Sequence, residues 1–231
     1  MSIPNYAQFV RVYMLKVSKI EKSYGASKVL RGIDFRMEEG ERIAIMGPSG
    51  SGKSTLLNCI GGIDRPDNGE ILFEGQILTS LSEQELCELR RNKISTIFQF
   101  FHLLPTLTAR ENIEFPMLLN SVSARERNQK VDELLNAVKI QHRAGAFPHE
   151  LSGGEKQRVA IARSLSMQPK LILADEPTGN LDSKNTDSVL ELIENLSKQH
   201  GIAMLLVTHN EEVTRICDQT ITMNDGLILS E

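Results

Sequence analysis

The chain has 231 residues, of which 40% are hydrophobic and 24% charged, a composition that is typical of a folded globular protein and excludes an intrinsically disordered one. Its formal net charge of −4 argues against general binding to nucleic-acid phosphates, and no apolar run approaches the roughly 18 residues that cross a bilayer. The three cysteines have neither zinc nor redox spacing, so we expect them to be reduced and structural, in a cytosolic protein.

The first third of the chain is predicted to be mainly β-structure. Residues 1–13 lack the basic start and long apolar core of a signal peptide. We interpret them as an N-terminal extension, or as the product of an upstream start codon, ahead of a domain at residues 14–231. Strands are expected at residues 16–24, 34–37, 42–46 and 70–73.

The middle third is predicted to be helical, and the last third alternates between strands and helices. In residues 125–138 the apolar side chains recur at i, i+3, i+4 and i+7. An apolar strand at 171–174, a helix at 183–198 and a strand at 204–207 follow. Such alternation predicts a parallel sheet with helices packed against it, and so an α/β fold. The helical middle, at about residues 85–165, is expected to be an insertion into this α/β body.

A glycine-rich loop matches the pattern G-x-x-x-x-G-K-[ST] at every position. An apolar run at 43–46 precedes it, and residues 53–60 can form the helix that should follow. Glycines let backbone N–H groups surround phosphate oxygens, while the lysine would bridge the β- and γ-phosphates and the serine would bind Mg²⁺. A Gly/Ser-rich turn is the alternative, but the lysine and the flanks favour a nucleoside triphosphate site. Its residues are Gly47, Pro48, Ser49, Gly50, Ser51, Gly52, Lys53 and Ser54.

Two acidic residues, Asp175 and Glu176, come directly after the apolar strand at 171–174. Open α/β sheets bind ligands at the carboxyl ends of such buried strands. Asp175 would complete the Mg²⁺ site with Ser54, and Glu176 could polarise a water in line with the γ-phosphate. Taken alone, the two acids could equally be solvated residues at a strand end. The phosphate loop makes the catalytic interpretation the better one.

A second glycine pair stands at a predicted helix start. Ser152 and Glu155 have the spacing of a capping box. Gly153 and Gly154 lie in the first turn, where each glycine costs roughly 1 kcal/mol of helix stability. They are explained if the backbone must approach a ligand closely, because a helix N-terminus binds anions. That anion need not be bound to the same copy of the protein.

Residues 151–157, Leu-Ser-Gly-Gly-Glu-Lys-Gln, resemble the signature motif of the ATP-binding cassette (ABC) ATPases. The other motifs of that family are present in the family's order: aromatic loop, Walker A, glutamine loop, signature, Walker B, D-loop and switch histidine. They correspond to Tyr24, residues 47–54, Gln99, residues 151–157, residues 171–176, Asn180-Leu181-Asp182 and His209. The resemblance covers nearly all of the chain from Met14 onward.

This resemblance implies a P-loop NTPase fold, with a RecA-like core around a mixed sheet, an antiparallel β subdomain and an inserted α-helical subdomain. It also implies ATP and Mg²⁺ as cofactors and ATP hydrolysis as the activity. In the family, two copies form a head-to-tail dimer with ATP between them, and Walker A of one copy faces the signature of the other. Ser152, Gly153 and Gly154 would therefore bind ATP held by the partner copy. Thr55 would add to the nucleotide site, and Asp182 would cross the dimer interface.

Individual catalytic roles follow from the same resemblance. Tyr24 would stack on the adenine, although an aromatic residue of the small β-layer is the alternative interpretation. Gln99 would bind Mg²⁺ and reach the attacking water, which Glu176 would orient. His209 ends a predicted core strand and would contact the γ-phosphate.

The segment after Gln99, residues 100–104, is unusually apolar for a solvated loop. In the family this region contacts the cytoplasmic coupling helix of a membrane subunit. An integral membrane permease is therefore expected to dock near Phe100 and Leu104, although some of these side chains belong to the core of the helical part. The chain would be a peripheral subunit at the cytoplasmic face of the inner membrane. Its other partner would be a second copy of itself, and no nucleic-acid partner is expected.

Residues 104–108 and 176–183 resemble a bacterial branch of the family that contains lipoprotein-releasing, macrolide-export and cell-division ATPases. Transport, with lipoprotein release as the first choice, is the preferred function. A regulatory cell-division ATPase, which drives a membrane complex without moving a substrate, is the alternative and would use the same catalytic residues. A soluble cassette protein of DNA repair or translation is disfavoured, because it would need a long coiled coil or two cassettes in one chain.

Overall fold

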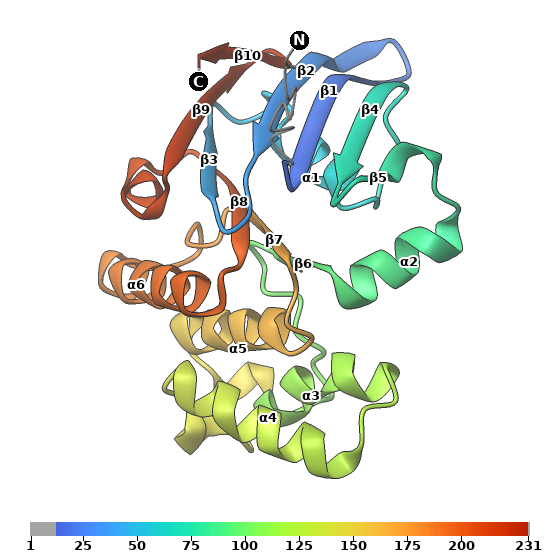
Figure 1. Ribbon diagram of the computed structural model, residues 1–231. Helices are drawn as coiled ribbons and strands as arrows, with labels where there is room; N and C mark the ends of the chain where they lie inside the picture. Colours follow the sequence, from blue (N-terminus) through green and yellow to red (C-terminus); the bar gives the residue numbers. More distant parts are fainter. Residues whose placement is uncertain (1–12, 231) are drawn as a thin grey trace, which may run out of the picture.

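The structure, a computed structural model, describes residues 13–230, so the predicted N-terminal extension lies outside the described residues except for Tyr13. Figure 1 shows an antiparallel sheet at one end of the molecule, a larger sheet in the middle and a layer of helices at the other end. No helix in this described part is long and apolar enough to cross a bilayer.

The central sheet is built from β3 (Arg42–Met46), β6 (Ile94–Ile97), β7 (Leu171–Asp175), β8 (Ala203–Thr208), β9 (Gln219–Asn224) and β10 (Leu227–Ser230). Its strand order is β10-β9-β3-β8-β7-β6. All neighbours are parallel except β9 and β10, which form an antiparallel pair at one edge. Parallel neighbours need crossover connections, and the helices between the strands supply them.

A second, antiparallel sheet is formed by β1 (Leu15–Tyr24), β2 (Ser27–Met37), β4 (Asn68–Phe73) and β5 (Gln76–Ile77), in the order β2-β1-β4-β5. Gly25, at a φ of 59°, provides the left-handed backbone of the tight turn from β1 to β2. Strand β1 pairs with β2 up to its last residue, Tyr24, which lies opposite Ser27, whereas its pairing with β4 ends at Glu21.

The helices begin at local sequence signals. They are α1 (Lys53–Ile60), α2 (Glu83–Asn92), α3 (Ala109–Leu119), α4 (Ala124–Ala137), α5 (Gly153–Leu165) and α6 (Ser183–His200), with short 3₁₀ turns η1 (Leu78–Ser80), η2 (Gln141–Arg143), η3 (Pro148–Glu150) and η4 (Glu211–Ile216). A serine or threonine and the glutamate three residues later form a capping box at the start of α2, α3, α4 and α5. Asp182 caps α6, which ends at Gly201.

Two hydrophobic cores pack against opposite faces of the central sheet. In β7, Leu171 and Leu173 belong to the core shared with α1 and the antiparallel sheet, whereas Ile172 and Ala174 belong to the core shared with α3, α4, α5 and α6. Successive side chains of a strand point to opposite faces, so burial on both faces explains why this strand reads as an unbroken apolar run.

The α/β fold expected from the sequence is confirmed, and the predicted elements lie at or near the expected residues. The strand predicted at 34–37 is the end of the longer β2, because residues 27–33 continue the pairing with β1. The hairpin β9–β10 is absent from the predictions, although its turn, Asp225-Gly226, has the positive φ angles (46° and 75°) of a type I′ hairpin. The limits of the domain, residues 14–231, and of the helical insertion, about residues 85–165, stay predictions.

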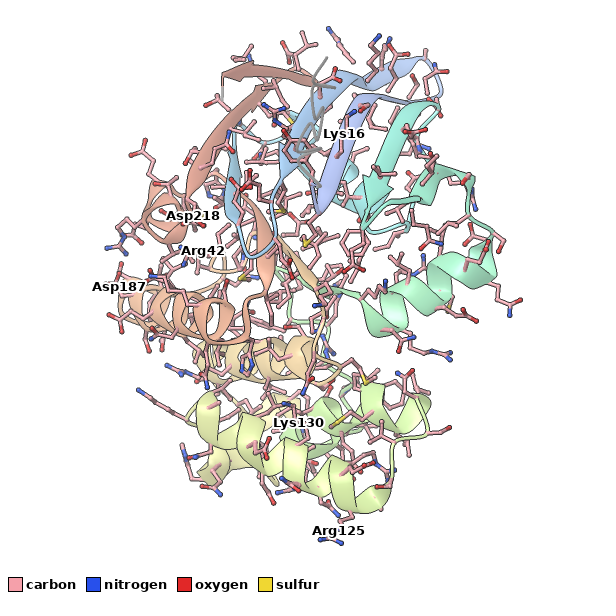
Figure 2. All side chains as sticks on the ribbon, in the orientation of Figure 1. Lys16, Arg42, Arg125, Lys130, Asp187 and Asp218 are labelled. Atoms are coloured by element: carbon pink, nitrogen blue, oxygen red, sulfur yellow. The ribbon has the colours of Figure 1, made fainter. Side chains whose placement is uncertain are left out.

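A buried arginine ties the start of β3 to the start of β9. Arg42 is 8% exposed, and its guanidinium donates to both carboxylate oxygens of Asp218, from Nε to Oδ2 at 3.1 Å and from Nη2 to Oδ1 at 2.7 Å (Figure 2). Its Nη1 atom lies 3.7 Å from Glu194 of α6. The hydrogen bond from Arg42 is the main reason why the pKa of Asp218 is lowered.

Replacing Asp218 with alanine should destabilise the fold, because Arg42 loses its bidentate partner. We expect a loss of about 1–2 kcal/mol in the free energy of unfolding at pH 7, less than for a fully buried pair because Asp218 is partly solvated. Urea unfolding measures this loss. Because the folded-state pKa of Asp218 is lowered, its contribution is present above the pKa of the unfolded chain and disappears as the pH falls through the folded-state pKa. The difference from the unmodified protein should therefore close in acid.

Asp187→Ala is the matched control, since Asp187 lies on the surface (Figure 2). It pairs with Arg215 at 2.6 Å, and the two side chains are 60% and 58% exposed. Exposed pairs contribute little, so this variant should unfold almost as the unmodified protein does. Equal losses for both variants would contradict the assignment of Asp218 as a structural tie.

Candidate active site

The segments predicted to hold functional residues meet at one edge of the central sheet. β8 lies between β3 and β7, and its last residue, Thr208, pairs with Met46 at the end of β3. Asp175, at the end of β7, pairs with Val207. The parallel register therefore brings the carboxyl ends of these strands together. The residues that follow them are those of the loop 47–54 after β3, Gln99 after β6, Glu176 after β7 and His209 after β8.

The glycine-rich loop between β3 and α1 surrounds a buried amine. Lys53 is the first residue of α1 and is 7% exposed. Its Nζ donates to the carbonyl oxygens of Gly47 at 2.8 Å and Pro48 at 2.9 Å. Burial lowers the pKa of this amine, while the carboxylates of Glu176 and Asp175 act in the opposite direction. The loop carbonyls thus bind the ammonium group of Lys53, and this cation lies near the carboxylates at the end of β7.

Close packing against neighbouring strands requires glycine at two positions of this loop. A Cβ atom on Gly47 would lie 2.0 Å from the carbonyl oxygen of Met223 in β9. Gly52 precedes α1 with a φ of 100°, and a Cβ atom there would lie 3.0 Å from the carbonyl oxygen of Val29 in β2. The loop backbone therefore lies directly against both sheets, which leaves no room for side chains on that side.

A hydrogen bond joins the start of α1 to the end of β7. The Ser54 hydroxyl donates to Asp175 Oδ1 at 3.0 Å. Burial raises the pKa of Asp175, whereas the hydrogen bond from Ser54 and the charge of Lys53 act in the opposite direction. Mg²⁺ is usually held by one or two protein oxygens together with phosphates and water. The pair therefore fits the magnesium site expected from the sequence.

Glu176 and His209 are in direct contact. Glu176 has a φ of 47°, which is uncommon outside glycine, and its backbone N–H donates to the Val207 carbonyl at 2.9 Å. Its Oε1 lies 2.7 Å from His209 Nδ1, and its Oε2 accepts from the Thr208 hydroxyl at 3.1 Å. The glutamate side chain is 15% exposed and that of the histidine 62%. The end of β8 therefore fixes a largely buried carboxylate beside an accessible imidazole.

Gln99 packs against the segment that follows Glu176. A Cβ atom on Gly179 would lie 2.9 Å from Gln99 Nε2 and 3.4 Å from Glu176 Cβ. The Asn180 side-chain amide donates to the Gln99 carbonyl at 2.7 Å. Asp182, two residues further on, caps α6. The structure thus brings Gln99 and Glu176 together, as the sequence predicts.

The glycine pair at the start of α5 lies beside the segment 179–185. A Cβ atom on Gly153 would lie 3.6 Å from the Asn180 carbonyl, and one on Gly154 would lie 2.6 Å from Asn185 Oδ1. Ser152 is the N-cap of this helix. Among the hydrogen bonds of residues 13–230, none joins these three residues to the loop 47–54. Within one chain, the predicted signature residues are therefore not connected to the phosphate loop.

Tyr24 lies at the border between the antiparallel sheet and α1. Its side chain is half exposed, and its hydroxyl donates to Asp64 Oδ2 at 2.5 Å. This hydrogen bond is the main cause of the raised pKa of Tyr24, and the Thr55 side chain also interacts with the hydroxyl. The structure thus brings Tyr24 together with Thr55 in the first turn of α1.

Two residues outside the predicted site hold the loop that follows β6. Arg163 of α5 donates to the carbonyl oxygens of Phe101 at 2.8 Å and His102 at 2.6 Å, two consecutive residues with left-handed φ angles of 62° and 44°. Asn112, on the buried face of α3, fastens Leu104 through hydrogen bonds to its N–H and its carbonyl. In the sequence, Arg163 and Asn112 could have been identified as polar residues on the apolar face of a predicted helix.

The residues at this edge fit a magnesium-bound triphosphate. A buried lysine and a glycine loop at a helix N-terminus form an anion site. The Ser54–Asp175 pair offers oxygen ligands to a divalent cation, and Glu176 is a carboxylate that can accept a proton from water. The arrangement can therefore bind a nucleoside triphosphate and position a water molecule for attack.

Comparison with known proteins gives a family match and similar solved structures. Residues 30–179 match the family model described as ABC transporter. The dimeric post-hydrolysis structure of the ATP-binding cassette MJ0796, bound to ADP and Pi, is 39% identical over 94% of this chain and 97% of that chain, with a TM-score of 0.87. A second dimeric structure of MJ0796, described as a bacterial ABC transporter cassette, gives the same values. CbiO1 from Clostridium perfringens, part of the ABC transporter complex CbiONQ, is 32% identical over 94% of this chain and 87% of that chain, with a TM-score of 0.87.

Replacing Gly47 with alanine should disrupt the phosphate loop, because the new methyl group collides with the Met223 carbonyl. We expect a loss of about 1–3 kcal/mol in the free energy of unfolding and a large loss of affinity for tripolyphosphate. Urea unfolding and titration calorimetry measure the two effects. Gly145→Ala is the control, since a Cβ atom there meets nothing within 4 Å, and it should change neither property. Unchanged binding by Gly47→Ala would contradict the predicted role of the loop.

Proposed function

Because the chain belongs to the ABC transporter family of ATP-binding cassettes, we propose that it binds and hydrolyses ATP to power a separate membrane subunit. The chain has the ATP-hydrolysing P-loop fold of that family. The observation that carries the proposal is the meeting of buried Lys53, the Ser54–Asp175 pair and the Glu176–His209 pair at one sheet edge.

Four side chains at this edge would bind phosphate and metal in the proposed reaction. Lys53, which donates to loop carbonyls in the structure, turns toward the β- and γ-phosphates. Ser54 and Asp175 would hold Mg²⁺, and Gln99, which follows β6, would be a further ligand of the same ion. When bound, MgATP supplies the phosphoanhydride bond that is broken.

Glu176 is the proposed general base. Its carboxylate accepts the proton of the water that attacks the γ-phosphate. His209 Nδ1 and the Thr208 hydroxyl hold the two carboxylate oxygens, so the base keeps a fixed orientation. The exposed side of His209 is free to contact the γ-phosphate, and Tyr24 stacks on the adenine.

A second copy of the chain completes each site in this proposal. Gly153 and Gly154 pack beside residues 179–185, Ser152 caps their helix, and among the described residues no hydrogen bond joins the three to the phosphate loop of the same chain. Their helix N-terminus fits the γ-phosphate bound to a partner copy. The dimeric structures of MJ0796 support such an assembly, and Asp182 would lie at its interface.

The membrane subunit is proposed to dock where apolar side chains are exposed near Phe100 and Leu104. Phe100 is 69% exposed, a high value for a phenylalanine, and Leu118 and Leu119 at the end of α3 are also exposed. A groove of about 340 Å³ lies between Leu119 and the edge strand β6, and Arg90, Arg91, Lys93 and Arg163 also line it. An amphipathic segment of a partner fits a surface that combines apolar and basic groups.

The specific role we propose is lipoprotein release or export, at the cytoplasmic face of the inner membrane. The support is the resemblance of residues 104–108 and 176–183 to the branch described above. A cell-division ATPase that drives a membrane complex without transport is the alternative. Purification of the complex separates the two. A partner with a large periplasmic domain that releases lipoprotein supports the first, and a partner fixed to cell-wall hydrolases supports the second.

Glu176→Gln should abolish most ATP turnover and leave ATP binding intact, because the amide keeps the size of the side chain but cannot accept a proton. We expect kcat to fall about 10²–10⁴-fold and the dissociation constant of ATP to change less than about twofold. A phosphate-release assay and titration calorimetry measure the two quantities. Lys53→Ala, by contrast, should weaken nucleotide binding itself. Undiminished hydrolysis by Glu176→Gln would remove this residue from the mechanism.

Phe100→Ser should prevent association with the membrane subunit without reducing stability, since the side chain is exposed. Tagged chain added to detergent-solubilised membranes of the source organism, followed by mass spectrometry, measures the capture of membrane-spanning proteins. Leu229→Ser is the matched control, because Leu229 is 62% exposed but lies on β10. Equal capture by both variants would place the docking surface elsewhere.

A further inference from the structure

We propose that Asp64 and Lys22 are positioning residues that hold the Tyr24 ring ready for the adenine base, an inference that rests on the proposed stacking role of Tyr24. The Asp64 carboxylate binds both partners: Oδ2 accepts from the Tyr24 hydroxyl at 2.5 Å, and Oδ1 accepts from Lys22 Nζ at 2.8 Å. The same Nζ atom lies 5.2 Å from the centroid of the Tyr24 ring, over its face. The three side chains thus form a closed set of contacts around one aromatic ring.

The charges of this set are mutually stabilising. Burial alone would raise the pKa of Asp64, but hydrogen bonds from Lys22, Tyr24 and the Arg65 backbone together outweigh it, and the pKa is lowered. Hydrogen bonding to Asp64 raises the pKa of Lys22. At neutral pH the carboxylate is therefore ionised and the lysine protonated, which are the states that these hydrogen bonds require.

The same contacts connect the Tyr24 ring to the phosphate-binding helix. Ile63 and Asp64 donate their backbone N–H groups to the Asn58 carbonyl, at 2.9 and 3.1 Å, so Asp64 is fastened to the last turns of α1. Helix α1 begins with Lys53, the residue at the centre of the phosphate loop. A hydrogen bond from Tyr24 to Asp64 therefore sets the position of the ring relative to the phosphate site.

Further hydrogen bonds join the end of β1 to residues 65–67, which follow Asp64 in the chain. Lys22 Nζ donates to the Arg65 carbonyl at 2.6 Å. The Ser23 N–H donates to Asp67 Oδ2 at 2.7 Å, and the Asp67 N–H donates to the Glu21 carbonyl at 2.8 Å. Because the backbone is held by these other contacts, removal of the Asp64 carboxylate should release the Tyr24 ring while the strand stays in place.

An exposed tyrosine without such contacts would sample several rotamers, and a base that stacks on it would have to order it. Ordering one flexible side chain weakens binding by roughly two- to tenfold. Lys22 over one face of the ring also directs the base to the opposite face. The set of contacts therefore orders the base-binding surface before the nucleotide arrives.

The test compares a ligand that has a base with one that lacks it, both of which resist hydrolysis. Titration calorimetry with ADP and with pyrophosphate, each with Mg²⁺, gives two dissociation constants for every variant. Asp64→Ala should weaken ADP about three- to tenfold and leave pyrophosphate within about twofold. Tyr24→Phe, which keeps the ring and removes the hydroxyl, should have the same effect. Lys22→Met should weaken ADP in the same selective way.

A double-mutant cycle makes the test independent of any single variant. If Asp64 acts through the Tyr24 hydroxyl, the variant with both Asp64→Ala and Tyr24→Phe should bind ADP no more weakly than either single variant. If the fold-loss of ADP affinity in the double variant equals the product of the two single losses, the two residues act separately, and the inference is overturned. The control is Glu21→Ala, because Glu21 on the same strand contacts Lys28 and Asn68 instead of Tyr24, and its ADP affinity should be unchanged.

The remaining outcomes separate this inference from the proposed function. Tyr24→Ala should weaken ADP at least as much as Asp64→Ala, and no effect of Tyr24→Ala would remove the stacking role and the inference with it. A normal ADP affinity for Asp64→Ala, together with a weakened Tyr24→Ala, would overturn the positioning role alone. Equal weakening of ADP and pyrophosphate by Asp64→Ala would show a general structural role and would also overturn it.

Discussion

The parallel register of β3, β8, β7 and β6 is the constraint on which the site depends. Backbone hydrogen bonds pair the last residues of β3 and β7 with those of β8, so three chain segments far apart in the sequence end at the same level. Lys53, His209 and Glu176 follow those ends. Both faces of these strands are covered by hydrophobic cores, so a shift of register would expose buried side chains and is strongly disfavoured. The chemistry at the edge is therefore positioned by the packing of the sheet.

The hairpin β9–β10 packs directly against the phosphate loop. The Met223 carbonyl in β9 excludes any side chain at position 47, and the Gly226 N–H in the hairpin turn donates to the Ser51 carbonyl at 3.1 Å. The Gly226 carbonyl in turn accepts from the Arg31 N–H of β2 at 2.9 Å. The last strands of the chain thus join the loop to the antiparallel sheet, and Arg42 and Asp218 anchor the start of β9 (Figure 2).

Helix α5 links two surfaces that are separate in the chain. Ser152, at its start, belongs to the signature residues, and Arg163, near its end, holds the carbonyls of Phe101 and His102 in the loop proposed to dock a membrane subunit. Its 13 residues span about 20 Å at 1.5 Å per residue. One helix therefore connects this loop to the signature end, which lies at the proposed interface with a second copy.

Sequence patterns alone predict the α/β class, the phosphate loop, the acidic pair after β7 and the capped start of α5, because each depends on a local motif or on the alternation of apolar residues. These patterns did not reveal the hairpin β9–β10, the hydrogen bonds of Arg163 and Asn112 to the loop after β6, or the hydrogen bond from Tyr24 to Asp64. The β9–β10 turn is local, and Asn112 is only eight positions from Leu104. In contrast, Arg163 is 61 and 62 positions from the carbonyls of His102 and Phe101, and Tyr24 is 40 positions from Asp64. Only the packing of the two sheets decides such distances, because no periodicity along the chain encodes which loops will meet.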